Sequence, residues 1–270
     1  MPELPEVETT RLGLLPLVGK IVEKVVVRNP AMRWPVPPQL VDILPGQKLQ
    51  HLQRRAKYLL ARFDSGTLIL HLGMSGSISL LAQDEPAQKH DHFELHFTNG
   101  NVLRLRDPRR FGAVLWCEGE VEEHVLLRSL GPEPLEDNFN GNLLYNKTRS
   151  RPAPVKNVIM DSSVVVGVGN IYASESLFRA GIHPNTAANK VSKLRYGKLA
   201  LEIKATLNDA LKAGGSSLRD FFGTDGNPGY FQQQYFVYGR AGKPCRRCGT
   251  AIKTIKLGQR STFFCPVCQR

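Results

Sequence analysis

The sequence predicts an α+β multidomain protein with a β-rich N-terminal part, a helical middle part and a small C-terminal metal-binding module. Three observations predict this organisation. Residues 20 to 116 contain runs of branched and aromatic residues that are typical of strands. From about residue 136 the hydrophobic period changes to that of helices. Four of the five cysteines then lie close together after residue 244.

The strand prediction rests on the segments "KIVEKVVVRN", "KYLLARF", "GTLILHLG" and "HFELHFTNGNVLRL". In the last segment Phe93, Leu95 and Phe97 alternate with polar positions before the turn "TNGN". Leu103 and Leu105 resume the alternation after it. Two alternating runs around an Asn-Gly turn predict a β-hairpin.

A long helix is predicted within residues 192 to 215, where Ser192 is a suitable N-cap and the glycine pair 214–215 a suitable stop. Its apolar positions recur every four residues: Leu199, Ile203, Leu207 and Leu211.

Two shorter helices are expected in front of the long one. Pro154 is placed to start one in "PAPVKNVIMD", and Gly181 and Pro184 end the other in "GNIYASESLFRAGIHP". The tight turn "SSVVVGVG" between them makes a helix-turn-helix variant. The boundary with the β-rich half is expected in "LGPEPLEDN", where Pro132 and Pro134 interrupt both periodicities.

The cysteine cluster has the spacing C-x2-C, sixteen residues, C-x2-C, which predicts one structural zinc ion. Its four ligands would be Cys245, Cys248, Cys265 and Cys268. Four thiolates leave no open position for a catalytic water. Paired disulfides are the alternative, disfavoured because nothing indicates export. The intervening segment predicts a hairpin with Arg260 near its tip, and the lone Cys117 is interpreted as a buried core thiol.

The charge balance points to a polyanionic partner, because 36 Lys and Arg face 24 Asp and Glu, a net charge of +12. A basic protein without such a partner is the alternative. No apolar run is long enough to cross a bilayer and the N-terminus does not resemble an export signal, so we expect a cytoplasmic protein.

Five stretches combine cations with residues that could enter a duplex: "QRRAKY", "HLGMSGS", "RDPRRFG", "NKTRSR" and "FVYGRAG". Each alone could be a solvated charged face. Phe111 could be a core residue or an exposed wedge of the kind that bends DNA. In "VGVGNIY", Asn170 and the helix N-terminus could hold a phosphate, or the segment could simply be a tight turn. The stretch "GGSSLRDFFGTDGNPGYFQQQ" is either a linker or a loop that closes over a ligand.

These pieces together resemble the formamidopyrimidine-DNA glycosylases over essentially the whole chain. The motifs that carry the resemblance are "MPELPEVET", "QRRAKYLL", "HLGMSG", "KHDH", "DPRRFG", "LGPEPL", "VGVGNIYASE", "GIHP", "DGNPGYF" and the terminal cysteines. The resemblance implies an N-terminal β-sandwich with an N-terminal helix (residues 1–131), a helix-two-turn-helix domain with a lesion-binding loop (132–234) and a zinc finger (235–270). It also implies a monomer that acts on double-stranded DNA near the nucleoid, with oxidised purines or abasic sites as targets.

The resemblance implies that Met1 is removed, so that the secondary amine of Pro2 is the nucleophile that attacks the sugar. An α-amino group has a lower reference pKa than lysine, so more of it is unprotonated at neutral pH. Glu3 would be the general acid, Lys57 would contact phosphate and assist β-elimination, and Arg260 would assist δ-elimination. Glu6 is interpreted as a helix cap.

The remaining site residues implied by the resemblance contact DNA. A target base must be flipped out of the duplex, and Met74, Arg109 and Phe111 would fill the gap it leaves. The other expected contacts, mostly to phosphates, are His71, His90, Arg151, Lys156, Asn170 and Tyr238.

Two other functions stay open on the sequence. One is excision of oxidised pyrimidines, as in the related endonuclease VIII enzymes. The other is damaged-DNA binding without catalysis, which a retained Met1 would favour because it blocks the amine.

Overall fold

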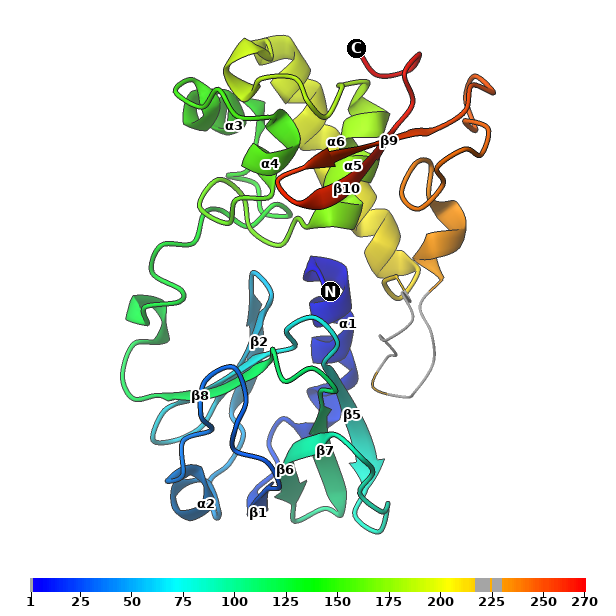
Figure 1. Ribbon diagram of the computed structural model, residues 1–270. Helices are drawn as coiled ribbons and strands as arrows, with labels where there is room; N and C mark the ends of the chain where they lie inside the picture. The colour runs from blue at the N-terminus through cyan, green and yellow to red at the C-terminus, as the bar shows by residue number, and fades with distance from the viewer. Residues whose placement is uncertain (1, 217–223, 225–229) are drawn as a thin grey trace. The chain divides into compact units, whose positions relative to one another are not determined.

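The computed structural model describes residues 2–216, 224 and 230–270. The chain divides into two compact units, one formed by Met1–Arg128 with Ala213–Tyr230 and the other by Ser129–Lys212 with Phe231–Arg270 (Figure 1). The proposed lesion loop "SSLRDFFGTDG" lies outside the described residues except for Ser216 and Thr224.

The first unit begins with helix α1, Leu4–Gly13, which has Glu3 as its N-cap and proline in its first turn. Proline is favoured there because its missing N–H would have no partner inside the helix. The helix ends where Thr224 lies against it. A side-chain carbon built at Gly13 would meet Thr224 Oγ1 at 1.7 Å, so only glycine permits this approach.

The described residues of the first unit form two antiparallel four-stranded sheets. One sheet has the order β1-β6-β7-β5, with strands β1 (Val22–Val27), β5 (Ser77–Ala82), β6 (Asp91–Phe97) and β7 (Asn101–Arg106). The other has the order β2-β3-β4-β8, with strands β2 (His51–Arg55), β3 (Tyr58–Arg62), β4 (Thr67–His71) and β8 (Ala113–Cys117). The described residues of this unit also form the short helices η1 (Leu15–Leu17), α2 (Leu40–Ile43) and η2 (Val121–Glu123).

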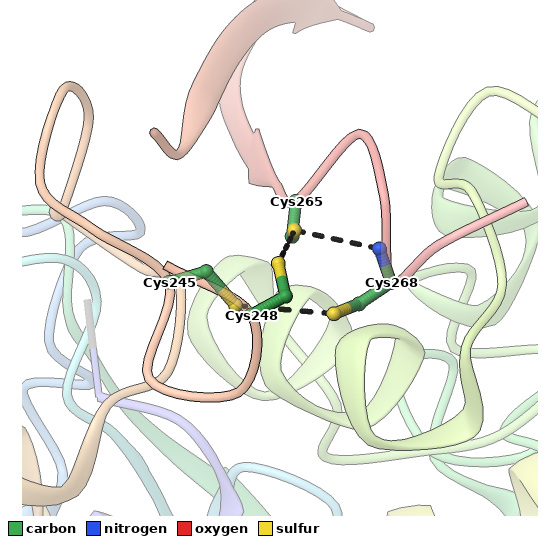
Figure 2. Close-up of side chains that lie close together, drawn as sticks. All are labelled: Cys245, Cys248, Cys265 and Cys268. Carbon is green, nitrogen blue, oxygen red and sulfur yellow. Dashed lines mark hydrogen bonds between the residues drawn. The ribbon is translucent and has the colours of Figure 1, made fainter. Parts of the chain in front are cut away.

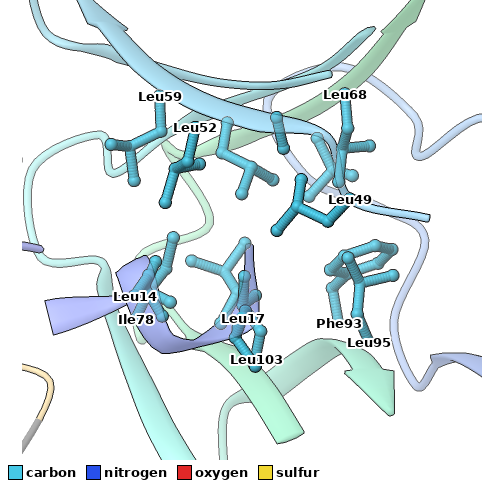
Figure 3. Packing of buried hydrophobic residues seen from close by; sticks show 14 of the residues in the cluster. Leu14, Leu17, Leu49, Leu52, Leu59, Leu68, Ile78, Phe93, Leu95 and Leu103 are labelled. Atoms are coloured by element: carbon cyan, nitrogen blue, oxygen red, sulfur yellow. The ribbon is translucent and has the colours of Figure 1, made fainter. Parts of the chain in front are cut away.

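A hydrophobic core lies between the two sheets, as Figure 3 shows. Leu59 and Leu68 come from one sheet, and Phe93 and Leu103 from the other. Leu17, which follows α1, packs in the same cluster. The predicted β-sandwich with an N-terminal helix is confirmed, and so is the hairpin that joins β6 and β7.

Strand β6 is buried on both faces, although its sequence alternates apolar and polar residues. Glu94 is fully buried and accepts a hydrogen bond from Arg104 Nε at 2.5 Å. Arg28 pairs with the same carboxylate at 2.7 Å. Burial acts to raise the pKa of Glu94, but these guanidinium groups and His96 hold it below its ordinary value. Arginine partners therefore allow the polar face of the strand to be buried.

The second unit is mainly helical and carries a two-stranded hairpin (Figure 1). Its longer helices are α3 (Gly141–Thr148), α4 (Val155–Ile159), α5 (Asn170–Ala180) and α6 (Lys193–Lys212). Its short helices and hairpin strands are η3 (Ala188–Lys190), η4 (Phe231–Gln234), β9 (Lys253–Leu257) and β10 (Arg260–Phe264).

The predicted helix ends agree with the structure. Pro154 is the N-cap of α4, and Gly181 closes α5 with a φ of 74°, a left-handed conformation that favours glycine. Ser192 Oγ accepts the Arg195 N–H at the start of α6. Among the described residues, no helix has the length and apolar character needed to cross a membrane.

Candidate active site and nucleic-acid interface

The N-terminal residues form a fixed structure at the start of α1. Pro2, Glu3 and Glu6 are all buried, the two acids with 2% of their surface exposed. Glu6 Oε2 accepts the Glu3 N–H at 2.8 Å in a capping box, as expected for a helix cap. Glu6 Oε1 also accepts the Ser216 N–H at 2.7 Å. The same carboxylate therefore fixes the start of α1 and the first residue of the predicted loop, a link that the sequence did not reveal.

Lys57 lies in the two-residue turn between β2 and β3, where Arg55 pairs with Tyr58. The preceding Ala56 is buried and has a φ of 55°, a conformation that is costly for alanine. The Lys57 side chain is half-buried, and its charge is felt by His71 on the neighbouring strand β4. The turn therefore presents the predicted lysine in the same compact unit as Pro2 and Glu3.

His71 is neutral at physiological pH. Burial lowers its pKa to about 4, and the charges of Lys57 and Arg33 act in the same direction. Its Nδ1 accepts the Gly73 N–H at 3.1 Å, and its ring lies 4.8 Å from that of Tyr58. His71 therefore helps to hold the turn that carries Met74, in addition to its predicted contact with DNA.

The three residues predicted to fill the duplex lie on two adjoining turns. Met74 and Phe111 are large apolar side chains that are 40% and 44% exposed. The Arg109 guanidinium lies 4.8 Å from the centre of the Phe111 ring, a cation–π arrangement. The turns touch at Gly73, where an added side-chain carbon would lie 2.4 Å from the backbone of Phe111. The geometry brings all three residues to one place on the surface of the first unit.

Asp107 organises this surface and was not identified from the sequence. It is fully buried, and its carboxylate accepts hydrogen bonds from Ser75 Oγ at 2.9 Å, the Arg109 N–H at 3.2 Å and the Gly112 N–H at 2.7 Å. Aspartate often bonds the backbone two residues further on, so its place in "RDPRRFG" was a usable signal. The Asp107 N–H also donates to the carbonyl of His90, whose backbone has a φ of 75°. His90 is one of the residues predicted to contact a phosphate.

In the second unit Asn170 is the first residue of α5, where helix N–H groups favour an anion. Its Nδ2 donates to the carbonyl of Ser261 on β10, in the β9–β10 hairpin near the cysteine cluster, at 3.1 Å. Lys156 is fully buried, and its ammonium donates to Asn170 Oδ1 and to Thr262 Oγ1, the latter at 2.7 Å. Lys156 thus links α4, α5 and the hairpin from inside, whereas we expected it to face a phosphate. That expected contact stays a prediction.

Tyr238 is positioned by Glu175, a second residue that the sequence did not single out. The fully buried Glu175 carboxylate accepts the N–H groups of Phe236, Val237 and Tyr238 at 2.8 to 3.0 Å. Burial raises the pKa of Glu175 although these N–H groups favour its charged form. The Tyr238 ring packs 5.2 Å from that of Phe263 on β10.

Two further predicted residues are more accessible. Arg151 pairs with Asp161 at 2.5 Å, and each side chain is 38% exposed. Arg260 is exposed at the first position of β10, opposite Leu257, which is the hairpin tip expected from the sequence.

The four clustered cysteines are arranged to hold one metal ion, as Figure 2 shows. Their sulfurs all lie within 4.8 Å of one another, with Cys245 to Cys268 at 4.0 Å and Cys248 to Cys265 at 3.5 Å. A tetrahedral zinc ion with four thiolates separates its sulfurs by about 3.8 Å. The residues fit a structural zinc, which completes the finger that carries Arg260.

Cys117 differs from the prediction of a buried core thiol. It ends β8 and is only half-buried, although burial still raises its pKa.

Four thiolates fit a structural rather than a catalytic zinc ion. A zinc finger together with exposed basic and aromatic side chains is typical of a DNA-binding protein. Comparison with models of known protein families identifies the family of this chain. The formamidopyrimidine-DNA glycosylase N-terminal domain matches residues 1–114 and the corresponding H2TH domain matches residues 130–222. A zinc finger found in FPG and IleRS matches residues 242–270.

Similar proteins extend over the whole chain. The formamidopyrimidine-DNA glycosylase of Methylobacillus flagellatus is 63% identical over 100% of this chain and 97% of its own length. That of Stutzerimonas stutzeri is 55% identical, with both chains fully covered. A Lactococcus lactis FPG variant solved with DNA containing Fapy-dG has a TM-score of 0.93 at 36% identity, with full coverage of both chains. MutM solved with DNA containing carbocyclic 8-oxo-G has a TM-score of 0.91 at 37% identity, again with full coverage.

The chain belongs to the formamidopyrimidine-DNA glycosylase family. It is a base-excision repair enzyme, a DNA glycosylase with AP lyase activity, and DNA is its partner. The alternative of a binding protein without catalysis is thereby disfavoured.

Proposed function

We propose that this enzyme excises oxidised purines, 8-oxoguanine and formamidopyrimidines, and then cleaves the strand by β- and δ-elimination. After Met1 is removed, the Pro2 amine attacks sugar C1′, the bond to the base breaks, and an iminium forms. Loss of a C2′ proton then expels the 3′ phosphate, and a second elimination releases the 5′ phosphate. Solved relatives bound to DNA with Fapy-dG, an abasic site and carbocyclic 8-oxo-G support this substrate class.

The observation that carries the proposal is the capping box at the start of α1. It buries Glu3 and fixes its backbone next to Pro2, whereas an unstructured N-terminus would leave both residues mobile. Preorganisation of a nucleophile and an adjacent carboxyl group lowers the cost of reaching the reactive geometry. Glu3 serves as the general acid for the departing base or the opening sugar.

The other site residues support this chemistry. Lys57 contacts phosphate and assists β-elimination, and Arg260 assists δ-elimination from the zinc hairpin. Met74, Arg109 and Phe111 fill the duplex after the base has flipped, an interpretation that their exposure and shared surface support. The further predicted DNA contacts are His71, His90, Arg151, Lys156, Asn170 and Tyr238.

We also propose the division into a catalytic β-sandwich domain (1–131), a helix-two-turn-helix domain with the lesion loop (132–234) and a zinc finger (235–270). The protein would act as a cytoplasmic, nucleoid-associated monomer. Its interaction with DNA would be driven largely by its net charge of +12.

Borohydride trapping tests the proposal. Incubation with an 8-oxoguanine duplex and borohydride should give a covalent complex whose tryptic map places the DNA on Pro2. A matched variant with one extra residue before Pro2 has no free proline amine and should give no complex through Pro2. Trapping only through an internal lysine would refute the proposed nucleophile. Faster turnover on a thymine glycol duplex than on 8-oxoguanine would favour the oxidised-pyrimidine alternative.

A further inference from the structure

Glu8 is the third acid of the opening segment, and the chemistry proposed above gives it no task. It lies on α1, two residues beyond Glu6 of the capping box, with 19% of its side chain exposed. Its partners come both from its own helix and from the neighbouring sheet.

The contacts of Glu8 form a chain that ends at the Lys57 turn. Arg11 donates to Glu8 Oε1 at 2.7 Å from the same helix and also to the Leu52 carbonyl of β2 at 3.3 Å. Arg54 Nε donates to Glu8 Oε2 at 3.1 Å. The same guanidinium donates through Nη1 to the Ala56 carbonyl at 3.0 Å. Arg54 therefore joins helix α1 to Ala56, the residue directly before Lys57.

This link acts on a turn that is unfavourable by itself. A two-residue hairpin turn with a positive φ favours glycine or asparagine, whereas alanine stands there with a φ of 55°. Such backbone strain persists only where the surroundings hold it, and it is common at functional sites. Arg54 is 11% exposed, so its bond to the turn is shielded from water.

The charge state of Glu8 suits this role. Burial acts to raise its pKa, but Arg11 and Arg54 hold the pKa below its ordinary value. The carboxylate is therefore ionised at neutral pH, where its hydrogen bonds to both guanidinium groups are charge-assisted.

We propose that Glu8 is a positioning residue that acts through Arg54 to hold the 56–57 turn, so that Lys57 keeps a defined place relative to Pro2 and Glu3. This inference rests on the proposed role of Lys57 in strand cleavage. The ion pair would thus do more than attach α1 to the sheet: it would set the position of Lys57 relative to Pro2 and Glu3 within the same compact unit.

A double-mutant cycle tests the inference. Single-turnover strand cleavage is measured on a duplex with a preformed abasic site, for Glu8→Ala, Lys57→Ala and the double variant. Small displacements of a catalytic group cost large factors in rate, so Glu8→Ala should lower the cleavage rate about tenfold. If Glu8 acts through Lys57, the double variant should be no slower than Lys57→Ala alone.

Arg54→Lys separates positioning from charge, because one ammonium group cannot hold Glu8 and the Ala56 carbonyl in the fork geometry of a guanidinium. It should be slowed as much as Glu8→Ala. Glu8→Gln keeps an oxygen acceptor for Arg54 and should recover most of the rate. Arg54→Lys replaces Glu8→Ala in the cycle should that variant fail to fold. The charge-matched control Glu23→Ala, an exposed position on β1, should cleave at the wild-type rate.

Additive losses in the cycle would overturn the inference, since they would mean that Glu8 affects the rate independently of Lys57. An unchanged rate for Glu8→Ala would overturn it as well, and an unchanged rate for Lys57→Ala would overturn it together with the role of Lys57. The proposed nucleophile is judged separately, because borohydride trapping through Pro2 does not depend on the rate of elimination.

Discussion

Replacing Glu6 by alanine should destabilise the first unit strongly. The change removes the acceptor for two buried backbone donors, the N–H groups of Glu3 and Ser216. Each buried donor left without a partner costs about 1–3 kcal/mol, so the pair amounts to about 2–6 kcal/mol. In a domain of this size each kcal/mol lowers Tm by about 2–4 °C, which gives a loss of roughly 10 °C. Glu6→Gln has one oxygen acceptor in place of two and should lose about half as much.

Thermal and urea unfolding of the wild type, both Glu6 variants and the control Glu23→Ala measure this loss. Hydrogen exchange then locates it, because the Ser216 amide should lose its protection in Glu6→Ala. Cleavage of an 8-oxoguanine duplex should fall in the same variant, since the backbone of Glu3 is released. A loss of stability below about 1 kcal/mol in Glu6→Ala would refute the reasoning, because one unpaired buried donor alone should cost that much.

Three further predictions concern the metal, a histidine and a lysine. The purified enzyme should contain one zinc per chain by mass spectrometry, and removal of the metal should abolish DNA cleavage; a metal-free preparation with full activity would contradict this. The pKa of His71 is about 4 in the folded protein and 6.5 in an unfolded chain. The free energy of unfolding should therefore be unaffected by this residue above pH 6.5 and should fall by up to about 3 kcal/mol as the pH decreases toward 4. Urea unfolding at pH 7 and pH 5 should show a smaller difference for His71→Gln than for the wild type. Lys156→Met should weaken binding to an abasic-site duplex and reduce the slope of log K against log salt by about 0.9, as expected for the proposed phosphate contact; an unchanged slope would instead indicate that Lys156 acts by holding Asn170.

The sequence by itself determined the features that depend on neighbouring residues. The spacing of four cysteines predicted the zinc module, and Gly181 and Ser192 predicted the ends of two helices. Asn99 and Gly100 predicted the turn of the β6–β7 hairpin. These predictions succeeded because capping, turn formation and metal ligation act over a few residues of chain or follow a recurrent spacing.

Only the tertiary structure showed which polar residues turn inward. Lys156 reads as a surface cation and Glu94 as the polar side of a strand, yet both are fully buried with partners from distant segments. The sequence predicts Glu6 as a helix cap. Only the structure shows that its second carboxylate oxygen also accepts the N–H of Ser216, which is distant in the chain. A charged side chain can be buried only where a partner from another part of the chain lies beside it, and a local sequence pattern does not show whether such a partner is present.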